Sequence, residues 1–177
     1  KRDIRYVCFH FILDGQDHKD DMGQSIAPEE LYSRMVAGAE AKTSQVAFGE
    51  YTEYFEQLLR EGKDILHVEF SSGLSGSYNS ARLVVDELKE KYPDRKIYLA
   101  DSLAASSGYG LIMETLADMR DAGKSVEELY QWIEENKLRM HHWFFSTDLT
   151  FYIKGGRISR TAGAVGTLLG ICPLLNM

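Results

Sequence analysis

The sequence predicts an α/β fold, in which a parallel sheet has helices on both faces, with an N-terminal β-hairpin before it and the start of a second α/β domain after it. Three observations lead to this prediction. Short apolar runs that favour strands alternate with segments of helical apolar spacing, and the connections are short. An Asp-Gly pair follows the first apolar run. Over residues 151–160 two adjacent glycines and closely spaced cations replace the strand and helix pattern, and we place a domain boundary near Asp148.

The N-terminal segment, residues 1–24, is predicted to form the β-hairpin at the edge of the fold. Residues 4–13 are rich in β-branched and aromatic side chains, which favour a strand. Asp14 and Gly15 then lead into a polar stretch, and this pair is typical of a hairpin turn.

Two helices are predicted at the start of the α/β ligand-binding domain, residues 25–147. Pro28 fits a first helical turn, and the apolar stripe that follows consists of Leu31, Tyr32, Met35, Val36 and Ala39. Residues 40–45 are polar and show no pattern, so Thr43 or Ser44 could simply cap the next helix. That helix ends at Gly62, and its apolar face consists of Tyr51, Tyr54, Phe55, Leu58 and Leu59.

A loop of eleven residues, 71–81, holds five serines and two glycines between a predicted strand, residues 65–70, and a predicted helix. Loops at the carboxyl ends of parallel strands bind ligands, and a helix start presents unpaired N–H groups. Serine hydroxyls there suit a carboxylate or phosphate oxygen. Serine and glycine also form ordinary turns and helix caps, so both interpretations stay open.

The rest of the sheet follows the same pattern. The strand at residues 96–100 ends in Asp101 and Ser102, and the helix after it opens on residues 106–110, whose glycines let another group approach the backbone. Residues 125–128 form a capping box that starts a further helix, and residues 142–145 are predicted as a third apolar strand. We assign residues 148–177 to a truncated second domain and expect flanking sequence to be missing.

Composition excludes several classes of function. A net charge of −7 without any Lys/Arg-rich run argues against a nucleic-acid partner. Cys8 and Cys172 are far apart and lack the spacing of metal ligands or of a disulfide framework, so we expect no metal, no disulfide and a cytoplasmic location. The most apolar stretch, residues 162–175, is too short to span a bilayer and is interrupted by glycines.

Four segments together resemble the DegV family of bacterial lipid-binding proteins. They are Thr-Ser-Gln at residues 43–45, Ser-Ser-Gly-Leu-Ser-Gly-Ser-Tyr-Asn-Ser-Ala at residues 71–81, Asp-Ser at residues 101–102 with Gly-Tyr-Gly at residues 108–110, and Gly-Gly-Arg-Ile-Ser at residues 155–159. Their order and separation are specific, although each alone is weak. With the helices between them they cover nearly the whole chain.

The resemblance implies a protein without catalytic residues that carries a long-chain fatty acid as its ligand and needs no cofactor. Such a protein holds the acyl chain in an apolar interior between two α/β domains and the carboxylate on hydroxyl groups. It would present that carboxylate to a separate kinase subunit, which uses ATP to form an acyl phosphate for phospholipid metabolism. Peripheral contact with a membrane is compatible with this role.

The family's site residues carry over by motif. Thr43 and Ser75 correspond to the hydroxyl donors to the carboxylate, and the N–H of Gly76 lies beside them. Ser44 and Ser72 are further candidates for ligand binding. Arg157 resembles the cationic residue at the mouth of the site, where it would meet the kinase subunit or phosphate.

The chain departs from the family pattern in three ways. Val46 and Ala47 replace the usual Pro-Ser, and Ser77 stands where threonine is commoner. An N-terminal Asp-Ser segment and most of the second domain, including a histidine near the head group, have no counterpart here. The set of site residues is therefore partial.

Two other functions are weighed against the lipid carrier. A serine hydrolase acting on a lipid or small ester could use Ser75 or Ser107 as nucleophile, but it needs a histidine within hydrogen-bond reach. His67 lies inside a predicted strand, and His141 and His142 begin another, so we expect core roles for them. A nucleotide binder fits the architecture, but the chain has neither a P-loop nor a Gly-x-Gly-x-x-Gly turn.

Overall fold

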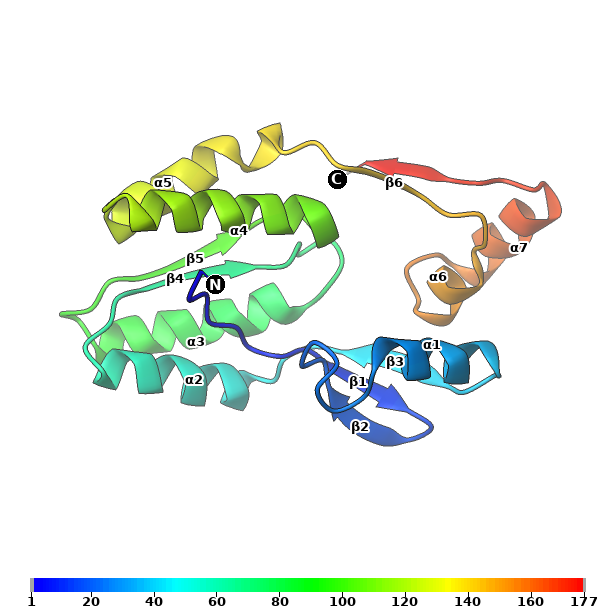
Figure 1. Cartoon of the computed structure of the whole chain (residues 1–177), viewed down its shortest axis with the longest axis horizontal. Helices are drawn as coiled ribbons and strands as arrows, with labels where there is room; N and C mark the ends of the chain where they lie inside the picture. Colours follow the sequence, from blue (N-terminus) through cyan, green and yellow to red (C-terminus); the bar gives the residue numbers. More distant parts are fainter. Residues whose placement is uncertain (1, 177) are drawn as a thin grey trace. The chain divides into compact units, whose positions relative to one another are not determined.

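The computed structural model describes residues 2–176, and the chain divides into two units that we describe separately. One unit comprises residues 47–143 together with the N-terminal residues as far as Val7. The other comprises residues 8–46 and 144–175. Figure 1 shows both units and labels most of their helices and strands. The domain boundaries that we expected from the sequence, near residues 24 and 148, stay predictions.

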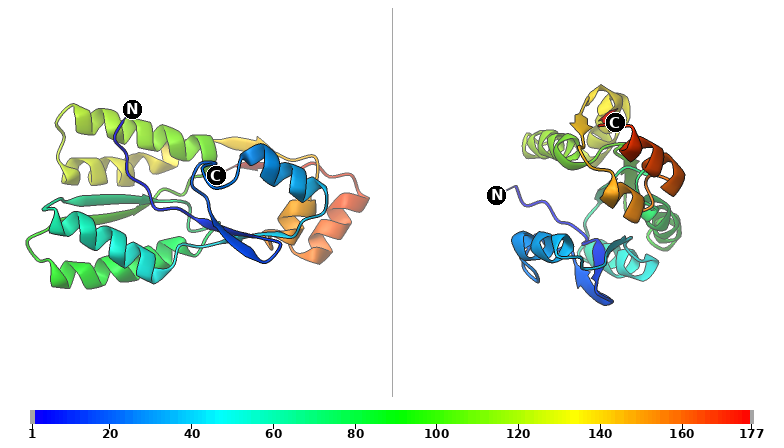
Figure 2. Two further views of the ribbon diagram at one scale, coloured as in Figure 1. Left: turned by 60° about the horizontal axis from the view of Figure 1, so that its bottom comes forward. Right: turned by 90° about the vertical axis from the view of Figure 1, so that its right-hand side faces the viewer.

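The first unit is a parallel strand pair between two layers of helices. Strand β4 (Ile65–Glu69) pairs with β5 (Ile97–Asp101) in a register that runs from Ile65 opposite Ile97 to Glu69 opposite Asp101. Helices α2 (Phe48–Arg60) and α3 (Ser77–Lys91) cover one face. Helices α4 (Ser106–Asp121) and α5 (Val126–Asn136) cover the other, as Figures 1 and 2 show. A short helix, η1 (Lys137–Arg139), follows α5. The predicted α/β fold with helices on both faces is therefore confirmed.

Apolar burial on each face of this strand pair explains the two helical layers. Toward α4 and α5 the core is built around Ala100, Ile112 and Ile133, none of them exposed. On the other face the buried apolar side chains of α2 and α3 are Tyr51, Phe55, Leu59, Ala81, Val84, Val85 and Leu88. The helical spacing seen in the sequence brings these side chains to the inner faces.

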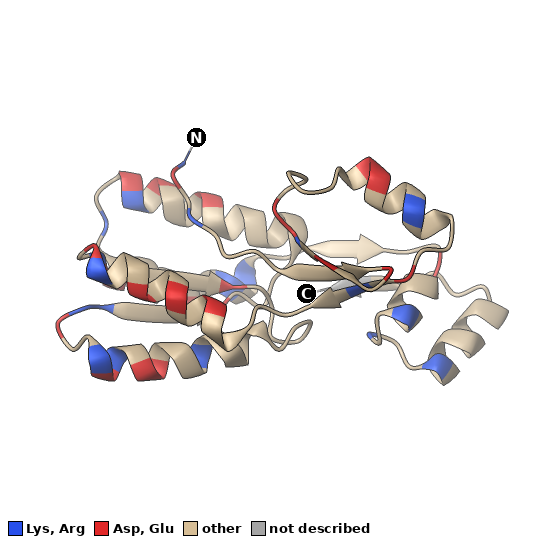
Figure 3. Cartoon of the chain, turned by 90° about the horizontal axis from the view of Figure 1, so that it is seen from below, with Lys and Arg blue, Asp and Glu red and all other residues tan. Residues whose placement is uncertain are grey.

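Lys, Arg, Asp and Glu residues lie along the same helices, with both signs of charge interspersed (Figure 3). Pairs such as Arg82 with Asp86 and Lys124 with Glu128 are four residues apart on one helix. At exposed positions such pairs contribute little to stability, because water and salt screen their charges. None of the helices within residues 2–176 is long and apolar enough to cross a membrane.

The second unit begins with the predicted hairpin. Strands β1 (His10–Leu13) and β2 (Gln16–Lys19) are joined by Asp14 and Gly15, both with positive φ, as the turn requires. Strand β3 (Ala41–Ser44) pairs with the other side of β1, so the order is β2-β1-β3. The unit also contains α1 (Pro28–Val36), α6 (Thr150–Lys154) and α7 (Arg160–Leu168). Strand β6 (Trp143–Phe145) pairs with β7 (Leu174–Asn176).

Two sequence expectations are wrong in detail. Residues 41–44 form the strand β3, because hydrogen bonds to β1 suit a polar edge strand that has no apolar face. Helix α1 forms as predicted, although none of its residues is buried and Val36 is 83% exposed. Residues 143–145 do form a strand, but it pairs with β7 and is no third strand beside β4 and β5.

The central packing gives a direct stability test. Ile112→Ala should lower the free energy of unfolding by about 2–5 kcal/mol, because Ile112 is fully buried and its loss leaves a cavity. The neighbouring Leu111, 52% exposed on the same helix, is the matched control, and Leu111→Ala should cost less than about 1 kcal/mol. Urea unfolding followed by circular dichroism measures both, and equal losses would contradict the packing described.

Candidate ligand-binding site

The serine-rich loop after β4 folds back on itself and leads into α3. The amides of Leu74 and Ser75 both donate to the carbonyl of Ser71, at 3.0 and 3.2 Å. Gly76 is the residue before the first turn of α3, which begins at Ser77. The loop therefore places Ser75 and Gly76 at the N-terminal end of a fifteen-residue helix, where N–H dipoles favour an anion.

Ser75 and Ser77 form a hydroxyl pair at this helix start. Their Oγ atoms are 2.9 Å apart, and the N–H of Ser77 also donates to Ser75 Oγ at 3.2 Å. Ser77 is completely buried, whereas Ser75 is partly exposed. The position of the Ser75 hydroxyl is thus fixed by the backbone and side chain of one buried neighbour.

Hydrogen bonds join this loop to the loop after β5. The amide of Ser71 donates to the backbone carbonyl of Ala104, and the amide of Ser102 donates to the backbone carbonyl of Glu69, both at 3.1 Å. The amide of Ser72 donates to the side-chain carboxylate of Asp101, also at 3.1 Å. The Asp101 carboxylate also accepts the N–H of Leu103 at 3.1 Å. The two loops are therefore held together at the carboxyl edge of β4 and β5, as parallel pairing predicts.

A buried carboxylate, that of Glu69, lies at the end of β4, two residues before the loop begins. Glu69, only 3% exposed, accepts hydrogen bonds from the Tyr51 hydroxyl at 2.5 Å and from the Phe70 amide at 3.2 Å. Its Oε2 is also 2.9 Å from His67 Nε2. These partners satisfy a charge that burial would otherwise make costly. His67 is thus bonded to Glu69, which agrees with the core role expected from the sequence.

Two tyrosines flank this carboxylate. Burial, the nearby Glu69 carboxylate and its hydrogen bond raise the pKa of Tyr51 far above its usual value, while a hydrogen bond with Ser77 opposes the rise. Tyr109, on α4, donates to the carbonyl of Val68, the residue before Glu69 in β4, at 3.0 Å. Burial, with the Glu69 charge, raises the pKa of Tyr109 to about 12. Both phenols therefore stay protonated at neutral pH.

Gly108, one of the glycines expected to let another group approach the backbone, is approached by the side chain of His142. A Cβ added to Gly108 would lie 2.3 Å from Nδ1 of His142, so any side chain at this position would require the imidazole to shift. The same Nδ1 lies 2.9 Å from the carbonyl of Met140. Gly108 therefore serves packing at the start of α4.

In the second unit, the structure brings together Thr43 and Arg157, which are 114 residues apart in sequence. Arg157 Nη2 donates to Thr43 Oγ1 at 3.2 Å, and Nη1 donates to the carbonyl of Gly155 at 2.6 Å. Gly156, with a φ of +74°, allows the chain to turn after α6. The neighbouring Ser44 Oγ donates to the carbonyl of Gln45 at 3.4 Å.

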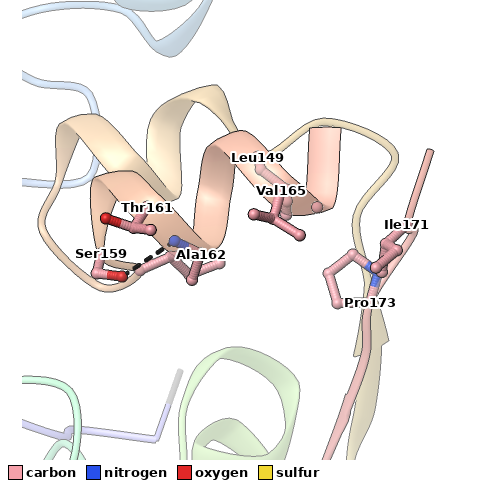
Figure 4. A pocket seen from close by; sticks show the side chains of 9 residues that line it. Leu149, Ser159, Thr161, Ala162, Val165, Ile171 and Pro173 are labelled. Atoms are coloured by element: carbon pink, nitrogen blue, oxygen red, sulfur yellow. Dashed lines mark hydrogen bonds between the residues drawn. The ribbon is translucent and has the colours of Figure 1, made fainter. Parts of the chain in front are cut away.

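An apolar pocket of about 610 Å³ lies in the same unit, along α7. Leu149, Val165, Ile171 and Pro173 supply apolar walls, as Figure 4 shows. Ser159 lies at its rim, where Oγ accepts the N–H of Ala162 at 3.2 Å and so caps α7. We did not predict this pocket, although the apolar residues at 162–175 were a signal for it.

The predicted site residues thus fall into two groups. Thr43, Ser44 and Arg157 belong to the second unit, and the first two lie at the end of β3. Ser72, Ser75 and Gly76 belong to the first unit, in the loop before α3. Among the described residues, no cluster of histidine, cysteine and carboxylate side chains could hold a metal ion.

Comparison with known proteins extends these observations. The model of the "Uncharacterised protein, DegV family" matches residues 1–177. A DegV domain-containing protein of Clostridium perfringens is 40% identical over 98% of this chain, and the match covers 60% of that relative. The chain thus spans about three fifths of the length of the curated relatives that it matches.

Two solved structures have a similar fold. A DegV family protein of Thermus thermophilus, described as fatty-acid-binding, has a TM-score of 0.81 and 29% identity over 99% of this chain and 61% of its own. The fatty acid kinase B3 protein of Streptococcus pneumoniae, loaded with linoleic acid, has a TM-score of 0.80 and 28% identity over 96% of this chain and 59% of its own.

The tyrosines beside Glu69 predict that stability declines in alkali. Above about pH 10 tyrosines of the unfolded chain ionise, whereas Tyr109 keeps its proton to about 12. Because the folded protein then binds more protons than the unfolded chain, the free energy of unfolding falls as pH rises through this range.

Tyr109→Phe should reduce this slope by at most about 1.4 kcal/mol per pH unit, the effect of one proton. Urea unfolding between about pH 9 and about pH 11 measures it. Tyr32→Phe, at a residue 63% exposed, is the control and should leave the slope unchanged. An unchanged slope in Tyr109→Phe would contradict the raised pKa.

Proposed function

The chain belongs to the DegV family, and from that premise we propose that it binds a long-chain fatty acid, with its carboxylate on serine and threonine hydroxyls. The observation that carries the proposal is the likeness, over 99% of the chain, to a fatty-acid-binding DegV protein. The hydroxyl contacts are our own assignment to Thr43 and Ser75. Ser44, Ser72 and the N–H of Gly76 are further candidates for the same ligand.

Hydrogen-bond geometry supports Thr43 and Ser75 as donors to a carboxylate. A hydroxyl has one proton to donate and two lone pairs, whereas an ionised carboxylate only accepts. Thr43 Oγ1 already accepts from Arg157, and Ser75 Oγ already accepts from the Ser77 amide. One lone pair of each hydroxyl oxygen is thus already used, which favours donation of the hydroxyl proton to a ligand.

Charge supports the same assignment. A carboxylate removed from water costs several kcal/mol unless charge-assisted hydrogen bonds compensate it, typically about 1.5–3 kcal/mol each. Arg157 supplies a guanidinium beside Thr43, and the start of α3 supplies helix dipole character beside Ser75. Both groups of the proposed site therefore favour an anionic head group.

The acyl chain supplies most of the affinity in this proposal. Each buried CH₂ contributes about 0.8 kcal/mol, so a long chain needs apolar walls more than polar contacts. The pocket along α7 has walls of this kind, and its volume lies within the usual range for ligand pockets. We assign part of the acyl site to Leu149, Val165 and Ile171.

The protein then acts as a carrier and not as an enzyme. We propose that it presents the bound carboxylate to a partner kinase, whose ATP would supply the phosphoryl group of an acyl phosphate. The likeness to the Streptococcus pneumoniae fatty acid kinase B3 protein supports this role. Among the described residues, the hydrogen bonds of the Ser75 hydroxyl go to Ser77 and not to a histidine, which weakens the hydrolase alternative, since a serine nucleophile needs a histidine as base.

Replacement of both hydroxyls should weaken fatty acid binding. Thr43→Ala with Ser75→Ala should raise the Kd for oleate at least about tenfold, the loss expected for two charge-assisted hydrogen bonds. Fluorescence competition after delipidation measures the Kd. Thr115→Ala, which removes a hydroxyl bonded to Leu111 on the exposed face of α4, is the control. Unchanged oleate affinity in the double variant would refute the head-group assignment.

Arg157 permits a test between two roles. If it supports the head group through Thr43, Arg157→Ala should raise the Kd for oleate about fivefold or more and affect oleyl alcohol less, because the alcohol carries no charge. Arg157→Lys should restore part of the loss. If oleate binding is unchanged and only phosphorylation by the kinase slows, Arg157 has the docking role expected from the sequence.

A further inference from the structure

The Ser77 hydroxyl is a buried polar group to which the proposed function assigns no role. It lies at the first residue of α3 with none of its surface exposed. Its Oγ is 2.9 Å from Ser75 Oγ, and its own N–H bonds to the same Ser75 oxygen. The amide and the hydroxyl of Ser77 therefore both contact the Ser75 hydroxyl, which we propose as a donor to the ligand carboxylate.

We propose that Ser77 is a positioning residue that makes Ser75 a donor toward the ligand, an inference that rests on the proposed function. The Ser77 amide occupies one lone pair of Ser75 Oγ, and the Ser77 hydroxyl occupies the other when it donates. The only remaining hydrogen-bonding capacity of Ser75 is then its proton. That state is complementary to a carboxylate, which accepts and cannot donate.

A second acceptor behind Ser77 makes this orientation depend on the ligand. The Tyr51 hydroxyl donates to Glu69, so its oxygen remains able to accept the Ser77 proton. While Ser77 donates to Tyr51, Ser75 can donate inward to Ser77. A carboxylate that takes the proton of Ser75 selects the opposite direction, in which Ser77 donates to Ser75.

This arrangement predicts selectivity between head groups. A charged carboxylate gains more from a Ser75 held as donor than does a neutral alcohol, because charge-assisted hydrogen bonds are roughly twice as strong. The relevant measurement is the selectivity ratio, which we define as the Kd for oleyl alcohol divided by the Kd for oleate. A general loss of stability or packing changes both constants and leaves this ratio nearly unchanged.

The test compares substitutions at two buried serines. Ser77→Ala keeps the amide, removes the hydroxyl and should lower the selectivity ratio about fivefold, the equivalent of one hydrogen bond. Ser77→Thr keeps the hydroxyl and should retain the wild-type ratio. Ser102→Ala is the matched control, since Ser102 is equally buried but its hydroxyl bonds only to the backbone of Ala104.

A ¹³C label on the carboxyl carbon gives a second measurement, which reports on the surroundings of the bound head group. With [1-¹³C]oleate bound, Ser77→Ala should move the carboxyl resonance toward its position in Ser75→Ala, and Ser102→Ala should leave it in place. The proposal is overturned if Ser77→Ala keeps the wild-type ratio and resonance, or if Ser102→Ala lowers the ratio equally.

Ser75→Ala separates this inference from the proposed function. If Ser75→Ala lowers the selectivity ratio and Ser77→Ala does not, only the positioning role of Ser77 is wrong. If Ser75→Ala also leaves the ratio unchanged, the carboxylate does not contact Ser75, and the proposed head-group site is itself wrong.

Discussion

Parallel pairing of β4 with β5 brings two loops to one edge of the first unit, and hydrogen bonds between those loops hold the serines there. The amide of Ser71 donates to the carbonyl of Ala104 after β5, the amide of Ser72 donates to the Asp101 carboxylate at the end of β5, and the amide of Ser102 donates to the carbonyl of Glu69. Because two of these three bonds join backbone groups alone, side-chain substitutions nearby leave most of them intact. The start of α3 is thereby a fixed platform for the hydroxyl of Ser75.

A negative charge buried beneath a proposed anion site needs compensation, and the structure provides it locally. Glu69 has a phenol, an imidazole and an amide as partners. Tyr51 and His67 are thus both partners of Glu69, whereas the hydrogen bonds of the Ser75 hydroxyl go to the side chain and backbone of Ser77.

Much of the fold could be predicted because local patterns determine it. Helical spacing identified α2 to α5, the Asp-Gly pair identified the hairpin, and the capping box at Ser125 begins α5 as expected. Strand β3 could not be predicted, because its pairing with β1 is a contact between distant residues and its own side chains are polar. The same limit applies to β6, whose apolar residues do not specify the partner strand.

The candidate site, like the fold, could be predicted only in part. Motifs singled out Thr43, Ser75 and Arg157, since residue types and order are visible in a sequence. The bond between Arg157 and Thr43 was not visible, because it joins positions 114 residues apart through the turn after α6. Ser77 is only two residues from Ser75 in sequence, but the contact between their hydroxyls could not be predicted either. The orientation of a hydroxyl depends on the three-dimensional course of the loop.

Gly108 and His142 restrict how this protein can vary. The imidazole occupies the space that a β-carbon at position 108 would need, so the two sites form one packing unit across α4 and the segment before β6. A larger residue at 108 requires the histidine side chain to move or to be replaced by a smaller one. Sequence changes at these two positions are therefore expected to depend on each other.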